Sequence, residues 1–278
     1  IGAGVHNWVS HYRGEWWTPD GGTTERDFAQ QLTVEFGSTM GGIDFTLPRL
    51  GEITGTVLDN QGNAVANAEV VMDSYTCCGY WYATTAADGS FRLEDVDQGS
   101  YSLVVHGKGV ESTWWTAGGG SPDPSFAETV QVEYDQVTGG VNFVVNRLAR
   151  VSGRVINTQG APIVSARPSL WNLDRNYWCY ACQIDYSDEN GAFAAYAPPG
   201  RYVISVEAWS YISEYWTSGG GTTLFQSADV VSLDYGSEFV ADFQLARLGV
   251  IQGTVRDNHG LSIGGIWIEG AGPTSGWA

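Results

Sequence analysis

Lysine is nearly missing from this sequence, since Lys108 is the only one in 278 residues. The 13 basic residues are outnumbered by 31 acidic ones, and the formal net charge at pH 7 is −18. A surface this acidic repels phosphate backbones, so nucleic acid is excluded as an expected partner. The same charge suits a soluble protein outside the cell.

Long apolar runs are missing as well. No stretch approaches the roughly 20 residues that span a bilayer, so this segment is expected to hold no membrane span. No signal peptide is visible, and because Ile1 is an unusual native start, we expect that a leader was removed or lies outside the segment. We therefore expect an extracellular or cell-surface location.

Helical patterns are also lacking. Runs of Ala, Leu, Glu and Lys at a period of 3.6 residues do not occur. Segments rich in Val, Thr, Ile and Tyr alternate instead with turns, and the chain contains 37 glycines. The chain is therefore predicted to be almost entirely β.

Catalytic motifs are missing too: the chain has no G-x-S-x-G, no H-E-x-x-H, no glycine-rich phosphate loop and no C-x-x-C-H. The four histidines fall at no recurring position. Carboxylates are numerous enough for a glycosidase pair, but an array of small domains promises no cleft to hold one. We predict that the protein is not an enzyme and has no cofactor.

What the sequence does contain is a repeat. The stretch GEITGTVLDNQG at 51–62 returns as ARVSGRVINTQG at 149–160 and as GVIQGTVRDNHG at 249–260. A period of about 100 residues corresponds to one small β domain. We predict the back half of a repeat at 1–50, complete repeats at 51–148 and 149–247, and the front half of a further repeat at 248–278.

Regularly spaced strands with turn signals between them indicate a β-sandwich, as in the turns at Asp59–Gly62 and Asp88–Gly89. The pattern G-x-V-x-D-x-x-G at 55–62, A-D-G-x-F at 87–91 and G-x-Y at 99–101 resembles the carboxypeptidase regulatory-like modules. These modules are relatives of the collagen-adhesin B-type and transthyretin-like sandwiches. The resemblance implies tandem immunoglobulin-like or transthyretin-like β-sandwiches of a bacterial surface or secreted protein.

The family serves as stalk, spacer, adhesin segment or enzyme accessory, so the resemblance specifies the fold better than the function. Many B-type adhesin repeats are locked by a Lys–Asn isopeptide bond. A single lysine cannot lock several repeats, and we reject such bonds as a general device here.

The cysteines are Cys77, Cys78, Cys179 and Cys182. An even number in a secreted β protein indicates disulfides, most simply 77–78 and 179–182. Adjacent residues lie about 3.8 Å apart at Cα, below the disulfide range that begins near 4.4 Å, so bridges between repeats or between chains stay open. Zinc is disfavoured because no histidine accompanies the thiols, and a thioredoxin-like role is disfavoured because no βαβ unit surrounds them.

Twelve tryptophans stand out. Trp17, Trp115 and Trp216 recur in register, which favours a core or inter-module contact over a flat platform for sugar rings. The less regular loop aromatics, Trp81 and Trp178, are better candidates for contact with a ligand or a neighbouring subunit.

Acidic turns at Asp59, Asp257 and 188–190 place oxygens where a calcium ion could bind, but no EF-hand or nonapeptide spacing accompanies them. Asp and Asn are also ordinary turn residues. The recurring Asp44, Asn142 and Asp242 are expected to point outward from the last strand of each repeat. We predict solvated turns and faces, and no metal site.

We therefore expect a structural array from an extracellular or cell-surface protein: a stalk, a filament subunit or an adhesin segment. Its partners would be neighbouring repeats and other copies of itself, with surface glycans as a further option. The half-repeats at 1–50 and 248–278 could also complete one another between chains. The alternative is a carbohydrate-binding or accessory region of a secreted hydrolase, which requires exposed, coplanar aromatics on one face.

Overall fold

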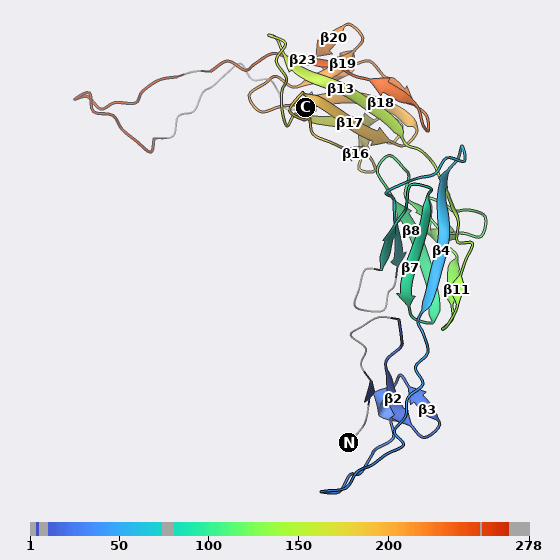
Figure 1. Cartoon of the computed structure of the whole chain (residues 1–278). Helices are drawn as coiled ribbons and strands as arrows, with labels where there is room; N and C mark the ends of the chain where they lie inside the picture. Colours follow the sequence, from blue (N-terminus) through green and yellow to red (C-terminus); the bar gives the residue numbers. More distant parts are fainter. Residues whose placement is uncertain (1–3, 6–10, 74–80, 251, 267–278) are drawn as a thin grey trace.

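The structure is a computed structural model that describes residues 4–5, 11–73, 81–250 and 252–266. Over these residues the regular structure consists of β-strands and single 3-10 turns, which confirms the predicted all-β class. No helix in this part of the chain is long and apolar enough to cross a membrane. Figure 1 shows the units following one another end to end from the N-terminal segment through the two complete repeats.

The first repeat packs two sheets into a sandwich. One sheet has the order β10-β8-β5-β6 with β9 also on β8, and the other has the order β11-β4-β12 with β7 also on β4. The strands are β4 (Gly51–Asp59), β5 (Glu69–Asp73), β6 (Tyr82–Thr84), β7 (Ser90–Val96), β8 (Gly99–His106), β9 (Thr113–Trp114), β10 (Thr129–Val132), β11 (Val137–Thr138) and β12 (Phe143–Val145), with the 3-10 turn η2 (Pro124–Phe126).

The second repeat has the same plan. Its sheets are β15-β14-β18-β19-β20 with β21 on β18, and β16-β17-β13-β22 with β23 on β13. The strands are β13 (Ala149–Asn157), β14 (Arg167–Asn172), β15 (Tyr177–Trp178), β16 (Gln183–Ile184), β17 (Ala192–Ala197), β18 (Gly200–Glu207), β19 (Glu214–Thr217), β20 (Gly220–Thr222), β21 (Val231–Leu233), β22 (Glu238–Val240) and β23 (Phe243–Leu245), with η3 (Phe225–Ser227).

The N-terminal segment carries one small sheet, β1-β2-β3, formed by β1 (Gly4–Val5), β2 (Glu15–Thr18) and β3 (Gly21–Thr23) and followed by η1 (Arg26–Phe28). Its β2–β3 hairpin matches the β19–β20 hairpin of the second repeat. Beyond residue 248 the described chain forms only an isolated bridge between Arg256 and Ser262.

Each complete repeat has its own hydrophobic core, built by alternate residues of facing strands. Ile53 and Val57 of β4 are fully buried in the first core, and Val151 and Val155 of β13 are fully buried in the second. The buried cluster of the first repeat draws on residues 53–145 alone, and that of the second on residues 149–245 alone. The two sandwiches are therefore separately packed bodies, and their relation depends on the contacts between them.

The glycine at the centre of the repeated motif has a steric cause. Strand β4 pairs in parallel with β11 at residues 52–53 and with β12 at 57–59, and the chain crosses over Gly55 between these two ladders. A Cβ atom at Gly55 would lie 1.8 Å from the carbonyl oxygen of Val141, and one at Gly153 would lie 2.0 Å from that of Ala241. Only glycine allows this backbone approach.

Asn142 and Asp242 complete the same crossover. The Asn142 Oδ1 atom accepts hydrogen bonds from the Thr56 backbone N–H and hydroxyl, at 3.1 and 2.9 Å, and Asp242 Oδ1 accepts from the Arg154 N–H at 2.8 Å. Both side chains are solvent-exposed, as expected, and their hydrogen bonds add a structural role. They replace the ladder hydrogen bond that the crossover interrupts.

The G-x-Y motif forms a tyrosine corner. The Tyr101 hydroxyl donates to the Asp97 carbonyl at 3.0 Å, and the Tyr202 hydroxyl donates to the Pro198 carbonyl at 2.9 Å, four residues back in both repeats. Similar corners close the turn before a core strand in other β-sandwiches.

We expect Tyr202→Phe to lower the free energy of unfolding of the second repeat by about 1 kcal/mol, because the Pro198 carbonyl loses its donor while the buried ring stays in place. Urea denaturation followed residue by residue measures the change. Tyr186→Phe, at an exposed tyrosine, is the control, and equal effects from the two variants would contradict a stabilising corner.

Candidate functional site: the joint between the repeats

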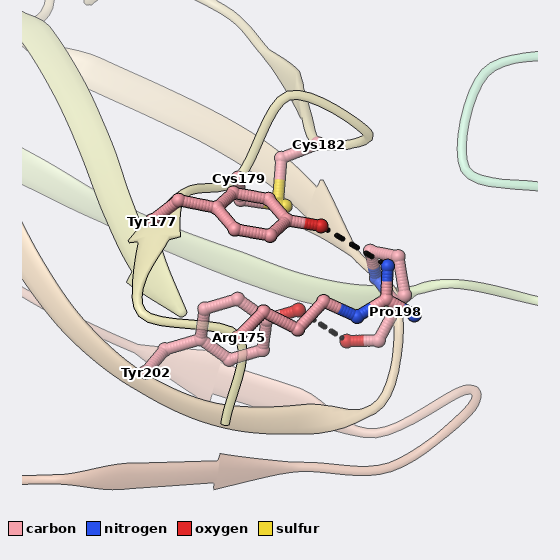
Figure 2. Close-up of a disulfide and its surroundings, with 6 residues drawn as sticks. All are labelled: Arg175, Tyr177, Cys179, Cys182, Pro198 and Tyr202. Carbon is pink, nitrogen blue, oxygen red and sulfur yellow. Dashed lines mark hydrogen bonds between the residues drawn. A yellow bond between two sulfur atoms is a disulfide. The ribbon is translucent and has the colours of Figure 1, made fainter. Parts of the chain in front are cut away.

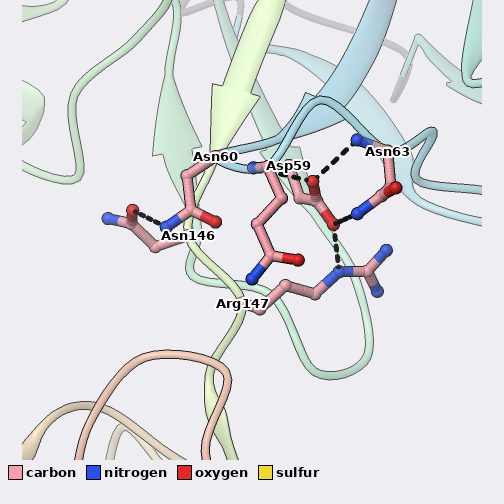
Figure 3. A network of polar contacts seen from close by, with 6 residues as sticks. Asp59, Asn60, Asn63, Asn146 and Arg147 are labelled. Atoms are coloured by element: carbon pink, nitrogen blue, oxygen red, sulfur yellow. Dashed lines mark hydrogen bonds and ion pairs between the residues drawn. The ribbon is translucent and has the colours of Figure 1, made fainter.

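The linker between the two sandwiches is held against the first repeat by a polar network (Figure 3). The Arg147 Nε atom donates to Asp59 Oδ2 at 3.0 Å. The Asn146 amide also donates to Glu111 Oε2 at 3.0 Å. The Asn60 backbone N–H also donates to the Val145 carbonyl at 3.1 Å. The short linker is thereby part of the first sandwich rather than a free tether.

Asp59 is the centre of this network. Its side chain is only 3% exposed, and it accepts from the backbone N–H groups of Gln61 and Asn63 and from the Asn63 amide, in addition to Arg147. Burial by itself raises the pKa of a carboxyl group, but here these hydrogen bonds to the charged form outweigh burial and lower the pKa of Asp59 below its ordinary value. Asp59 is therefore held as a carboxylate that fixes both its turn and the linker.

Gln183 connects the second repeat to a loop of the first. Its Oε1 atom accepts from the Gly109 N–H at 2.7 Å, and its Nε2 group donates to the carbonyls of Gly107 and Val110 at 2.9 and 3.3 Å. We call these three bonds the Gln183 clamp. The oxygen and the nitrogen of the amide are both satisfied by backbone groups of residues 107–110. The three bonds therefore fix the orientation of the Gln183 side chain on this loop as well as its distance from it.

The only lysine of the chain lies in the same contact. The Lys108 Nζ atom is 2.6 Å from Asp185 Oδ2 and lies 5.9 Å from the centre of the Tyr196 ring. The ion pair raises the pKa of Lys108 above its ordinary value. Because both partners are solvent-exposed, the pair adds orientation more than stability.

Gly109 is required here by close packing. Its φ of +72° lies in the left-handed region, and a Cβ atom would lie 3.0 Å from the Tyr196 ring. On the other side of the joint, the Tyr235 hydroxyl donates to Glu111 Oε2 at 2.7 Å. Burial and the neighbouring carboxylate raise the pKa of Tyr235 to about 12, so this donor stays protonated across the physiological range.

We call each linker, together with the loops that contact it, a joint. The backbone hydrogen bonds of the joint occur three times. At the end of each unit, a leucine N–H of the linker donates to a carbonyl in a loop of the unit that the linker leaves. The residue two positions further along that loop donates to a linker carbonyl in return. The pairs are Leu50–His11 and Arg13–Pro48, Leu148–Gly109 and Glu111–Asn146, and Leu248–Ser210 and Ile212–Ala246, all between 2.8 and 3.0 Å.

The side chains of the joint vary while its backbone pattern is kept. At the first joint His11 Nδ1 lies 2.7 Å from Asp95 Oδ1, and Arg13 Nη1 lies 2.5 Å from Asp97 Oδ2. Tyr134 donates to Asp97 within the first repeat, beside the Arg13 contact, whereas Tyr235 donates to Glu111 of the preceding repeat. The geometry therefore defines a contact site between repeats, since polar groups of neighbouring repeats bond to one another across the boundary.

The cysteines divide into two groups. Cys179 and Cys182 form a disulfide with a Cα–Cα distance of 5.3 Å, at the turn before β16 (Figure 2). Cys77 and Cys78 lie outside the described residues. In the part of the chain that is described, no group of three His, Cys, Asp or Glu side chains is arranged to hold a metal ion.

Two of the recurring tryptophans pack within their own repeats. Trp115 and Trp216 are half-buried against the cores of their own repeats, and Trp216 contacts Phe239 edge-on at 4.9 Å. Trp17 is half-buried on β2.

The loop aromatics face solvent. Trp81 and Trp178 are exposed, and Trp178 meets Trp171 edge-on at 87°. Tyr177 and Tyr180 are nearly parallel, but they stack on one another at 6.0 Å instead of lying side by side as a platform for sugar rings.

Sequence reasoning missed the residues that make the joint. Gln183, Lys108 and Tyr235 carry no motif, and they become neighbours only when the two sandwiches meet. The one available signal was the pair of glycines that flank the single lysine, Gly107 and Gly109, because glycine allows another part of the chain to approach its backbone closely.

This arrangement defines a class of protein: an all-β array in which separately packed sandwiches meet at hydrogen-bonded joints. Residues 52–145 match the model of the carboxypeptidase regulatory-like domain, which confirms over the first repeat the resemblance found from its motifs. No curated protein matches the chain.

Several solved structures are similar at low identity. The TIE protein of Bacillus anthracis is 11% identical over 77% of this chain and 40% of that chain, with a TM-score of 0.29. The minor pilin GBS52 of Streptococcus agalactiae is 9% identical over 74% of this chain and 99% of its own, with a TM-score of 0.32. The shaft pilin spaA of Lactobacillus rhamnosus GG is 10% identical over 72% and 98%, with a TM-score of 0.32. Likenesses at this level say nothing of function.

Proposed function

We propose that this chain is a structural segment of an extracellular or cell-surface protein, in which sandwich repeats are joined end to end into a stiff rod. The repeats would be 1–50, 51–148, 149–247 and 248–278, the outer two being partial. The observation that carries the proposal is the joint, in which the same backbone hydrogen bonds hold the linker at Leu50, Leu148 and Leu248 to the unit before it. A joint built the same way each time would hold each repeat in a fixed orientation relative to the one before it.

The chemistry of the chain supports a location outside the cell. A disulfide at Cys179–Cys182 is stable in oxidising compartments and uncommon in a reducing cytosol. The net charge of −18 keeps an elongated protein soluble. Neighbouring repeats, and other copies in a filament or array, are the partners that this function requires.

The test is Gln183→Ala, which removes the clamp and leaves both cores untouched. Each of the three bonds contributes about 1 kcal/mol, so we expect the spread of angles between the repeats to widen while the unfolding of either repeat changes by less than about 0.5 kcal/mol. Small-angle scattering and single-particle electron microscopy measure the angles. The control is Gln131→Ala, at an exposed glutamine of β10 whose hydrogen bonds lie within the first repeat.

A rod whose wild-type repeats already sample a wide range of angles would contradict the proposal, because its joints would not hold direction. Unchanged angles in Gln183→Ala would mean that the linker network at Asp59 and Arg147, and not the clamp, limits the angle between the repeats.

A further inference from the structure

The disulfide lies directly beside the joint. Cys182 is followed by Gln183, the residue of the clamp, and Asp185, the partner of Lys108, comes two residues later. Figure 2 shows the disulfide at the turn that leads into this segment, above the corner of Tyr202 and Pro198. The covalent bond and the contact with the first repeat are thus parts of one short stretch of chain.

The end of this stretch nearest the disulfide has little regular pairing. Strand β16 consists of Gln183 and Ile184 and pairs with β17 at Tyr196 and Ala195, and the Asp185 N–H continues the contact by donating to the Ala194 carbonyl at 2.9 Å. A pairing of two residues is marginal by itself. Tyr180, inside the disulfide loop, is 84% exposed. The half-buried Cys179, Cys182 and Ile184 contact the core, so the disulfide holds the end of the stretch that carries Gln183.

We infer that the Cys179–Cys182 disulfide is a positioning element for the joint, and that its reduction loosens the contact between the repeats while both sandwiches stay folded. This inference rests on the proposed function, because it describes how the stiffness of the rod would respond to a reductant. Gln183 makes the contact, and the disulfide acts through Gln183 by limiting where the β16 segment can lie.

The chemical step is a thiol–disulfide exchange with a dithiol. One thiolate of the dithiol attacks a cysteine sulfur, forms a mixed disulfide and releases the other cysteine as a thiolate. The second thiolate then attacks the dithiol's own sulfur in the mixed disulfide, closes the cyclic disulfide and releases the remaining cysteine. Cys179 and Cys182 together gain two electrons and two protons, and the dithiol is oxidised to its cyclic disulfide. The half-buried sulfurs lie in a turn beside exposed Tyr180, on the outside of the repeat.

The Gly109 amide is a direct reporter of the joint, because it donates to Gln183 Oε1. Its hydrogen exchange is measured by NMR in the full chain, with and without dithiothreitol, in a Cys77→Ser/Cys78→Ser background so that only the pair at 179 and 182 responds. Opening a loop of four residues raises the population of a released segment by roughly tenfold or more in the chain-entropy model. We expect the exchange of Gly109 to accelerate by that factor, and the core amides of Val105 and Val206 to keep their rates.

A second variant makes the test independent of the reductant. Cys179→Ser/Cys182→Ser should show the accelerated Gly109 exchange without dithiothreitol. In Gln183→Ala, where the clamp is already lost, reduction should add nothing at Gly109.

Unchanged Gly109 exchange after complete reduction, verified by thiol titration, would overturn the inference while leaving the rod intact. Equal acceleration at Val206 would also overturn it, because the disulfide would then stabilise the whole repeat. A Gly109 amide that exchanges freely even in the oxidised wild type would instead contradict the proposed function, since no clamp would exist to be loosened.

Discussion

Gly153→Ala is expected to destabilise the second repeat by about 3 kcal/mol, because the added methyl group overlaps backbone atoms that are held in place by the hydrogen bonds of the crossover. The new Cβ atom would lie 2.0 Å from the Ala241 carbonyl oxygen and 2.6 Å from its carbon. Relieving the overlap requires the crossover between β22 and β23 to shift, which breaks the Ala241 N–H bond to Ser152 and the Arg154 N–H bond to Asp242. Gly55→Ala should affect the first repeat in the same way.

The chain provides its own control at the third copy of the motif. A Cβ atom at Gly253 has no atom within 4 Å among the described residues, so Gly253→Ala should leave the unfolding of both repeats unchanged. Residue-resolved urea denaturation separates the two repeats, whose cores are distinct and need not unfold together. A loss of less than about 1 kcal/mol in Gly153→Ala would mean that the crossover yields easily, and the steric account of the motif would be wrong.

Asp59→Ala is expected to lower the stability of the first repeat by about 3 kcal/mol, and Asp59→Asn by about 1 kcal/mol. Alanine leaves the Gln61 and Asn63 N–H groups without their acceptor and Arg147 without its partner. Asparagine keeps the turn, as Asn157 does in the second repeat by accepting from Gln159 and Ala161. The difference between the variants therefore isolates the turn from the charged contact with the linker.

The charged contact has a pH signature. Because the pKa of Asp59 is lower in the folded chain than its ordinary value of 3.8, the carboxylate stabilises the fold fully above that value. This stabilisation is lost as pH falls from 3.8 through the lowered folded pKa. The stability gap between wild type and Asp59→Asn should therefore shrink in that window.

Denaturation at pH 7 and at steps below about pH 4 measures the gap. Glu69→Gln is the control, at an exposed carboxylate of the same repeat. A gap that stays constant with pH would assign the effect of Asp59→Asn to shape instead of charge.

Much of the fold could be predicted because the determining interactions are local in sequence and occur more than once. Alternation and turn residues indicated strands, and the repeated glycine at 55, 153 and 253 marked the same position in each copy. The tyrosine of G-x-Y was likewise visible as a pattern, since its hydroxyl bonds to a carbonyl only four residues back. The crossover that explains the glycine was not visible, because it joins residues 86 and 88 positions apart in the two repeats.

The sequence by itself determined the all-β class, the repeat and the acidic surface, since each depends on composition and on local periodicity. Only the tertiary structure decided which residues join the repeats. Trp115 and Trp216 recur in register and each packs on the core of its own repeat, whereas Gln183, Lys108 and Tyr235 lie on separate segments of two repeats. Their contact depends on the relative placement of two folded sandwiches, and a linear pattern does not encode that placement.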